Sequence, residues 1–123
     1  MSDPTPLPCI DLTAIEELRE LVDEDTPDFL KDLLRSFLED AGEHLRSMTT
    51  GLESQAVETI MAAAHTLKSS SANLGALQLS DFCRQIETIT RNRNLDGVSD
   101  LLESAHQEFK RVQKEIQNLP DFD

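Results

Sequence analysis

The chain has 123 residues, which is enough for one domain with its own hydrophobic core. Its 24 acidic and 11 basic residues give a formal net charge of −13, which argues against binding nucleic acid or an anionic membrane. No apolar run is long enough for a transmembrane helix, and the N-terminus lacks the basic-then-apolar pattern of a secretory signal. The two cysteines, Cys9 and Cys83, do not make a disulfide framework, so these features together predict a cytoplasmic protein.

A flexible arm and a short helix are expected at the N-terminus. Residues 1–9 contain Pro4, Pro6 and Pro8, which favour an extended arm or linker. The first helix is predicted to begin near Asp11 or Thr13, because Thr13 and Glu16 can form a capping box. Its buried face is marked by Ile10, Ile15, Leu18 and Val22. We expect this short helix to cover one end of a bundle.

A long second helix is expected to begin at Thr26-Pro27, where threonine can cap and proline suits the first turn. It is predicted to run to about Met48, with Gly51 closing the segment and Ser54 capping the next helix. Its apolar residues are Leu30, Leu33, Leu34, Phe37, Leu38, Ala41, Leu45 and Met48. This stripe is wider than one helix contact requires. It indicates contact with two neighbouring helices or, alternatively, an edge that continues as a docking patch.

Three more helices complete the predicted fold. One runs from about residue 54 to Gly75, with its apolar face at Ile60, Ala64, Leu67, Ser71 and Leu74. Another covers residues 76–91, and the last follows a turn at 92–97 and runs to about residue 118, before Pro120. No stretch of the sequence alternates apolar and polar residues, so no β-strand is expected. Short connections between long helices predict an all-α, antiparallel up-down four-helix bundle with a short additional N-terminal helix, spanning residues 10–119 and followed by a tail at 120–123.

One side of the third predicted helix carries a nucleophile beside a cation. His65 lies roughly 100 degrees round from the apolar face, and Lys68 and Ser69 follow it on the same side. Met61 and Ala62 precede it there. An imidazole is partly uncharged near neutral pH and can attack phosphorus, and a lysine one turn away can neutralise the phosphoryl charge. The alternatives are a structural or merely exposed histidine and a solvated surface lysine.

The stretch that begins at His65 resembles a known signature. Residues 65–76 read HTLKSSSANLGA, and the following helix continues with Leu79, Phe82, Cys83, Ile86 and Glu87. This pattern is similar to that of histidine-containing phosphotransfer (HPt) domains, the four-helix modules of multistep two-component phosphorelays. One departure is Ser69, which stands where the family usually has glycine. The predicted helix layout extends the resemblance to about residues 10–119.

The resemblance implies a phosphocarrier. His65 would accept a phosphoryl group, through its Nε2, from a receiver-domain aspartate and pass it to another receiver domain. The implied partners are response-regulator receiver domains and a hybrid sensor histidine kinase, and the receiver would bring Mg²⁺. Glu87 would orient the imidazole through its non-reacting nitrogen, or else be a solvated helix carboxylate. Docking is expected to use Met61, Ala62, Ser69 and Ala72, with Arg84 either helping or forming a surface ion pair.

Other functions find less support in the sequence. There is no Walker-type or glycine-rich nucleotide loop, so the chain is expected to have no ATP-dependent kinase activity and no cofactor of its own. His44 and His106 are expected to be surface residues, and no metal site is predicted. Two alternatives remain: a non-transferring interaction module, which Ser69 mildly favours, and an inert structural bundle fused to something larger. The polar outer faces favour a monomer.

Overall fold

The structure is a computed structural model that describes residues 9–122, and within them it contains helices and no strand. The helices are α1 (Leu12–Arg19), α2 (Phe29–Glu53), α3 (Val57–Asn73), α4 (Leu77–Arg91) and α5 (Val98–Gln117). A short 3₁₀ turn, η1 (Pro120–Phe122), follows α5. The all-α prediction is therefore confirmed. No helix in this part of the chain is both long and apolar enough to cross a membrane.

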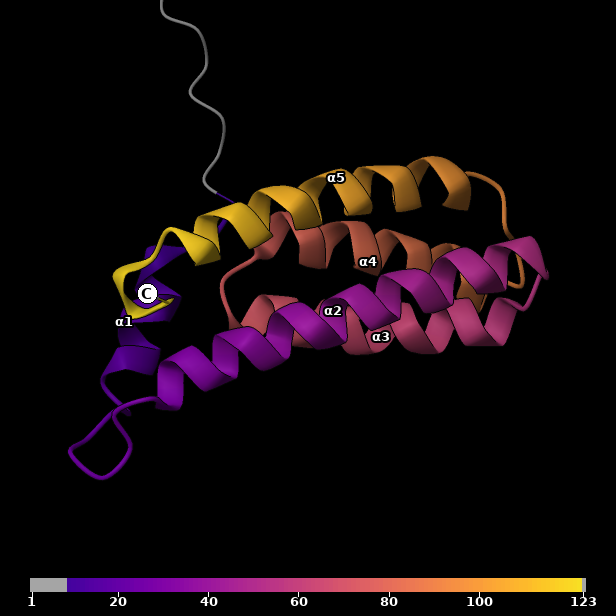
Figure 1. Cartoon of the computed structure of the whole chain (residues 1–123). Coiled ribbons are helices and arrows are strands. Elements are labelled where there is room, and N and C mark those ends of the chain that lie inside the picture. The colour runs from indigo at the N-terminus through magenta and orange to yellow at the C-terminus, as the bar shows by residue number, and fades with distance from the viewer. Residues whose placement is uncertain (1–8, 123) are drawn as a thin grey trace, which may run out of the picture.

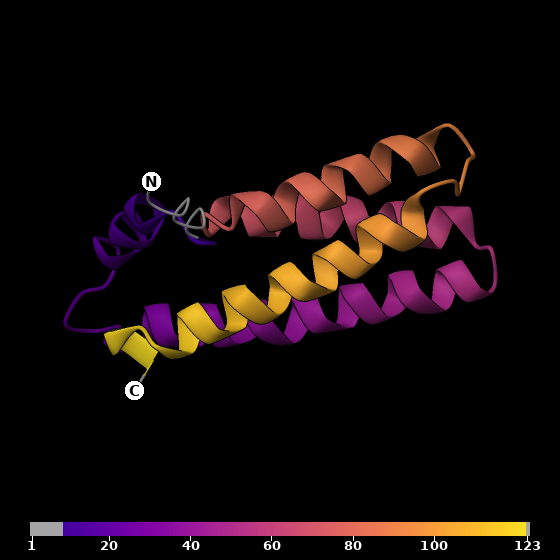
Figure 2. The same cartoon turned by 90° about the horizontal axis from the view of Figure 1, so that it is seen from above.

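The four long helices form an up-down bundle. Helix α3 packs against α2 and α4, and α5 packs against α4 and α2, so that each helix has two neighbours (Figure 1). The α2–α3 and α4–α5 connections lie at one end of the bundle, and α1 lies at the other end beside the C-terminus (Figure 2). This is the predicted arrangement, including the short helix at one end.

The core of the bundle is aliphatic and follows the predicted helical spacing. All five predicted positions of the α3 face are buried, and Ser71 is among them. On α2 the buried residues are Leu30, Leu34, Phe37, Ala41, Leu45, Met48 and Gly51. The wide apolar stripe of this helix packs against two neighbours, α3 and α5, as the first interpretation predicted.

The N-cap of α1 differs from the predicted capping box. Asp11 is the capping residue, and its carboxylate accepts a hydrogen bond from the Thr13 amide at 2.9 Å. Glu16 instead forms an ion pair with Arg19 one turn later. Because an aspartate two residues ahead already satisfies the Thr13 amide, the Thr13–Glu16 box is not formed.

The predicted ends of α2 were also wrong. The helix begins at Phe29 after Asp28, while the Thr26 hydroxyl binds Asp23 in the preceding turn. It runs past Met48 and Gly51 to Glu53. Gly51 lies within the helix, and its lack of a side chain permits close approach to α3: an added Cβ would lie 2.9 Å from the Ile60 side chain. Ser54 is the C-cap of α2 and not the N-cap of α3.

Gly75 ends α3 as predicted and also holds α1 in place. Its φ of +80° suits glycine, and its carbonyl accepts a hydrogen bond from the Asp11 amide at 2.7 Å. An added Cβ would lie 2.8 Å from the Asp11 carbonyl oxygen. The turn after the motif helix therefore anchors the start of α1 through close backbone contact.

Both predicted terminal segments have parts within the described residues. Residues 1–8 of the expected arm lie outside them, whereas Cys9 is buried against the core. At the other end α5 stops at Gln117, and η1 packs against α2. The side chain of Phe122 is half-buried against the core. Cys9 and Phe122 therefore both contribute to the packing of the bundle.

Candidate functional site

His65 projects from the middle of α3 into solvent. Its side chain is 60% exposed. Ala62, Ser69 and Ala72 are exposed on the same helix, and Met61 is half-buried. The structure thus brings together His65 and the small residues predicted around it, and leaves the imidazole open to approach by another molecule.

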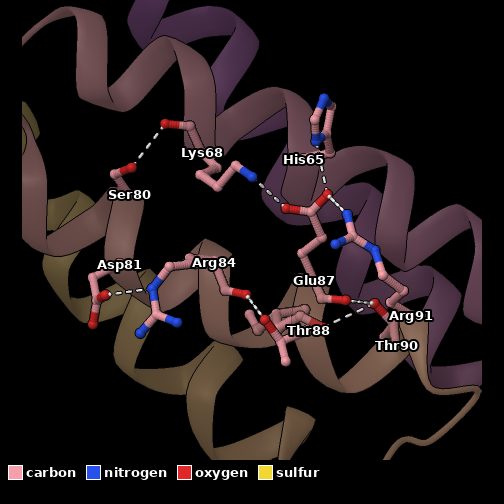
Figure 3. A network of polar contacts seen from close by, with 10 residues as sticks. His65, Lys68, Ser80, Asp81, Arg84, Glu87, Thr88, Thr90 and Arg91 are labelled. Carbon is pink, nitrogen blue, oxygen red and sulfur yellow. Dashed lines mark hydrogen bonds and ion pairs between the residues drawn. The ribbon is translucent and has the colours of Figure 1, made fainter.

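A buried carboxylate from the next helix lies under the imidazole. Glu87 on α4 is only 3% exposed, yet it meets three polar side chains (Figure 3). Its Oε2 lies 2.7 Å from His65 Nδ1 and accepts a hydrogen bond from Arg91 Nη2 at 2.8 Å. Its Oε1 accepts a hydrogen bond from Lys68 Nζ at 2.6 Å. The burial of Glu87 contradicts the alternative of a solvated helix carboxylate.

The partners of Glu87 keep it ionised. Burial alone would raise the pKa of this carboxyl, but the hydrogen bonds and positive charge contributed by Lys68 and His65 outweigh burial and lower it. An ionised carboxylate only accepts hydrogen bonds, so His65 Nδ1 must carry the proton between them. In the neutral form of the imidazole the other ring nitrogen, Nε2, then holds a free lone pair. Figure 3 shows this nitrogen on the side of the ring away from Glu87.

Lys68 lies beside the histidine as predicted, but its ammonium group is bound to Glu87. The side chain is half-buried, and the Lys68 carbonyl accepts a hydrogen bond from the Ser80 hydroxyl on α4 at 2.8 Å. This contact ties α3 to α4 one turn beyond His65. The lysine is therefore held near the imidazole by both its backbone and its side chain.

Arg91 belongs to this cluster and was not predicted. It follows Glu87 by four residues on α4, a spacing at which acidic and basic side chains commonly pair. The burial of Glu87 also had a signal, because Cys83, Glu87 and Thr90 are spaced by four and three residues and all face the core. Both signals can be found in the sequence itself.

Arg84 and Gln85 lie outside the cluster. The Arg84 Nε donates to Asp81 Oδ1 at 2.9 Å, and the Gln85 amide donates to Asp81 Oδ2 at 2.9 Å. For Arg84 the structure thus contains the predicted alternative, an ion pair on the surface of α4. Its exposed guanidinium is still accessible to another molecule.

The other two histidines lie partly covered at the surface of the bundle. His106 Nε2 lies 3.2 Å from the Thr49 hydroxyl, which links α5 to α2. His44 is partly covered on α2. Within residues 9–122, no group of three or more His, Cys, Asp or Glu side chains could hold a metal ion.

Comparison with known proteins identifies the family of the chain and similar solved structures. The family model for the Hpt domain matches residues 32–121. Histidine-containing phosphotransfer protein 5 of Arabidopsis thaliana is 28% identical over 106 residues, covering 84% of this chain and 68% of that protein. Multistep phosphorelay regulator 1 of Schizosaccharomyces pombe is 27% identical over 113 residues, covering 92% of this chain and 38% of that protein. The crystal structure of histidine-containing phosphotransfer protein B (HptB) from Pseudomonas aeruginosa PAO1 superposes with a TM-score of 0.79 at 28% identity, covering 92% of this chain and 98% of that one.

Proposed function

We propose that His65 is the phosphoacceptor of this chain, which belongs to the Hpt domain family and is a phosphorelay phosphocarrier. One observation carries the assignment: the His65 side chain is 60% exposed with Nε2 pointing away from Glu87, while a buried, ionised carboxylate holds its Nδ1 (Figure 3). A histidine that was merely structural would have its reactive nitrogen covered or bonded. The phosphoryl donor is the acyl phosphate of a receiver-domain aspartate.

The transfer requires little chemistry from this chain. The Nε2 lone pair attacks phosphorus, the bond between phosphorus and the aspartyl oxygen breaks, and that oxygen keeps the bonding electrons as a carboxylate. No proton moves, because Nδ1 keeps its own. The ring becomes positively charged, and Glu87 faces that charge at 2.7 Å. Lys68 supplies a cation for the transferred group, so this chain contributes orientation and electrostatic stabilisation.

The face around His65 is suited to docking a receiver domain. Ala62, Ser69 and Ala72 are small enough to let a partner approach the ring, and Met61 adds apolar area. A groove of about 200 Å³ between α1, α2 and the C-terminal end of α3 is lined in part by Leu18, Leu33, Phe37 and Asn73. We propose that this face, with Arg84 at its α4 side, binds response-regulator receiver domains and the receiver of a hybrid sensor histidine kinase. The receiver brings Mg²⁺ to the shared site.

We further propose a carrier with no ATP-dependent kinase activity of its own, which acts as a monomer in the cytoplasm. The phosphoryl group then comes from proteins and goes to proteins. Two free, buried cysteines support a reducing compartment. Incubation with labelled ATP and Mg²⁺ should leave the chain unlabelled unless a kinase and a receiver are added.

Transfer from a phosphorylated receiver tests the assignment. Wild type should acquire an acid-labile, base-stable label, and His65→Gln should acquire none. His44→Gln is a matched control, because it makes the same substitution at a half-buried histidine on α2 and should label like wild type. Label on His65→Gln at the wild-type rate would contradict the assignment.

The competing function is a non-transferring module that binds receiver domains, which Ser69 in the family's glycine position favours. It predicts binding of receiver domains without label. A panel of phosphorylated receivers, each tested for both binding and label, distinguishes the two. A Ser69→Gly variant sharpens the comparison: if the hydroxymethyl group obstructs the approach to His65, this variant labels faster than wild type.

A further inference from the structure

The three donors on Glu87 are divided unequally between its two oxygens. Oε2 holds two of them, His65 Nδ1 and Arg91 Nη2, whereas Oε1 holds Lys68 Nζ. We propose that Arg91 is a positioning residue, the counter-ion that stays on Glu87 when Lys68 turns to the phosphoryl group. This inference rests on the proposed function of His65.

Lys68 cannot serve both groups in the conformation observed. Its ammonium lies 2.6 Å from Glu87 Oε1, while the phosphoryl group would be attached to Nε2, on the side of the His65 ring away from that carboxylate (Figure 3). A lysine has a flexible stem and a compact charge, so it can swing from one anion to the other. The transferred group, with its larger negative charge, attracts it away from Glu87.

Release of Lys68 would leave Glu87 Oε1 without the partner it has in the resting site. Glu87 is 3% exposed, and a buried carboxylate that loses its counter-ion is strongly disfavoured. Arg91 prevents that situation because it is bonded to the other oxygen and does not have to move. It therefore lowers the cost of moving Lys68 while its own guanidinium stays on Glu87 Oε2.

The charges of the cluster agree with this role. In the resting site the cations Lys68 and Arg91 face one carboxylate, which leaves one net positive charge beside a neutral imidazole. Phosphorylation adds about two negative charges on the phosphoryl group and one positive charge on the ring. The phosphorylated cluster is then close to neutral. Without Arg91 it would carry a net negative charge next to a buried carboxylate.

Arg91 can be replaced with little effect on the fold. Its side chain is 67% exposed and lies at the edge of the site, so the effect of its loss is limited by solvent. A matched control is Arg93, two residues later, whose guanidinium pairs with Glu58 at 3.0 Å away from the cluster. Glutamine is suitable there, because Gln55 in this chain adopts nearly the same positive φ as Arg93.

The test follows the stability of the phosphorylated protein with a small phosphodonor, phosphoramidate, so that docking to a receiver plays no part. Wild type, Arg91→Gln, Arg91→Lys and Arg93→Gln are phosphorylated, and the loss of the phosphohistidine signal is followed by ³¹P NMR. Arg91→Gln should lose its phosphoryl group roughly three- to fivefold faster, the size expected for one exposed ion pair. Arg91→Lys should recover most of the difference, and Arg93→Gln should match wild type.

A second pair of variants shows whether Arg91 acts through Glu87. In a Glu87→Gln background the carboxylate charge is gone, so Arg91→Gln should change the rate by less than about 1.5-fold. Any of three results would overturn the inference. Arg91→Gln could change the rate equally in both backgrounds, Arg91→Gln could leave the rate unchanged, or Arg93→Gln could accelerate the loss as much as Arg91→Gln. The proposed function fails separately, if wild type takes no phosphoryl group from phosphoramidate or from receivers.

Discussion

Two glutamates in this bundle are buried to the same extent and have opposite electrostatic environments. Glu87 on α4 and Glu108 on α5 are each 3% exposed. Glu87 has three donors, and its pKa is lowered because these contacts outweigh burial. Glu108 has Arg111 on Oε1 at 2.7 Å, its Oε2 has no hydrogen-bond partner among the described residues, and burial raises its pKa.

This difference separates a carboxylate that can serve a functional site, Glu87, from one that is only buried in the core, Glu108. Each glutamate lies at a core-facing position of an amphipathic helix, so burial alone does not distinguish them. What distinguishes Glu87 is that its donors come from two helices, α3 and α4, and that one of them is an exposed imidazole. A carboxylate that stays charged at such a place can fix a tautomer. A carboxylate with a raised pKa cannot do so as reliably.

The largest expected effect comes from removing each carboxylate and measuring transfer. Glu87→Ala should slow phosphoryl transfer from a receiver by roughly 10- to 100-fold, by analogy with the loss of a group that orients a metal-binding histidine. Glu108→Ala should change the rate by less than about twofold. Stopped-flow or quench-flow labelling measures both. If Glu87→Ala and Glu108→Ala transferred the phosphoryl group at equal rates, Glu87 would have no special role in transfer.

The next effect is on stability and depends on pH. The folded-state pKa of Glu87 is below its unfolded value, so ionised Glu87 stabilises the fold above about pH 4.3, the ordinary glutamate pKa. Glu87→Gln should therefore lower the free energy of unfolding by about 2 kcal/mol at pH 7. This deficit should shrink as the pH falls through the lowered pKa. Urea unfolding at several pH values measures it, and a deficit that grew in acid would show the opposite sign.

Glu108 should show the reverse pH dependence. Its pKa is raised in the folded state, so the stability associated with its protonated form is lost as the pH rises through that pKa. Glu108→Gln should raise the free energy of unfolding by about 1 kcal/mol at pH 7. The gain should disappear in acid, where Glu108 is protonated in any case. If Glu108→Gln destabilises the protein at pH 7, then Arg111 compensates burial more fully than the raised pKa implies.

The smallest effect concerns a buried polar group without charge. The Ser71 hydroxyl on α3 is fully buried and has no hydrogen-bond partner among the described residues. Ser71→Ala should raise the free energy of unfolding by about 0.5 kcal/mol, because the desolvated hydroxyl is removed at nearly constant shape. Thermal unfolding with the Ser70→Ala variant as a neighbouring control measures this change. A loss of more than about 1 kcal/mol would indicate a partner for the hydroxyl.

Much of the fold could be predicted from the sequence, because periodic burial is a local property. The α3 face from Ile60 to Leu74 was predicted position by position. The helix ends were less predictable. Gly51 lies inside α2, where its missing side chain makes room for Ile60 on another helix, and Asp11 caps α1 two residues before the expected box. Each of these outcomes depends on a competing contact that composition and spacing do not reveal.

The central histidine of the candidate site could be predicted from the sequence, whereas its surroundings could be predicted only in part. His65, Lys68 and Glu87 were named from the motif, and the structure places them in one hydrogen-bonded cluster. Arg91 was not named, because an arginine four residues after a glutamate is ordinarily a surface pair. Its place in the cluster depends on Glu87 facing inward beneath His65. That orientation results from the packing of α4 on α3.

The central claim is that Glu87 holds the proton on His65 Nδ1 and leaves Nε2 as the nucleophile. The most direct measurement uses protein with ¹⁵N-labelled histidine rings, phosphorylated by a receiver and examined for ³¹P–¹⁵N coupling. The account predicts coupling to Nε2 of His65, with Nδ1 still protonated. Coupling to Nδ1, or to another histidine, would contradict it.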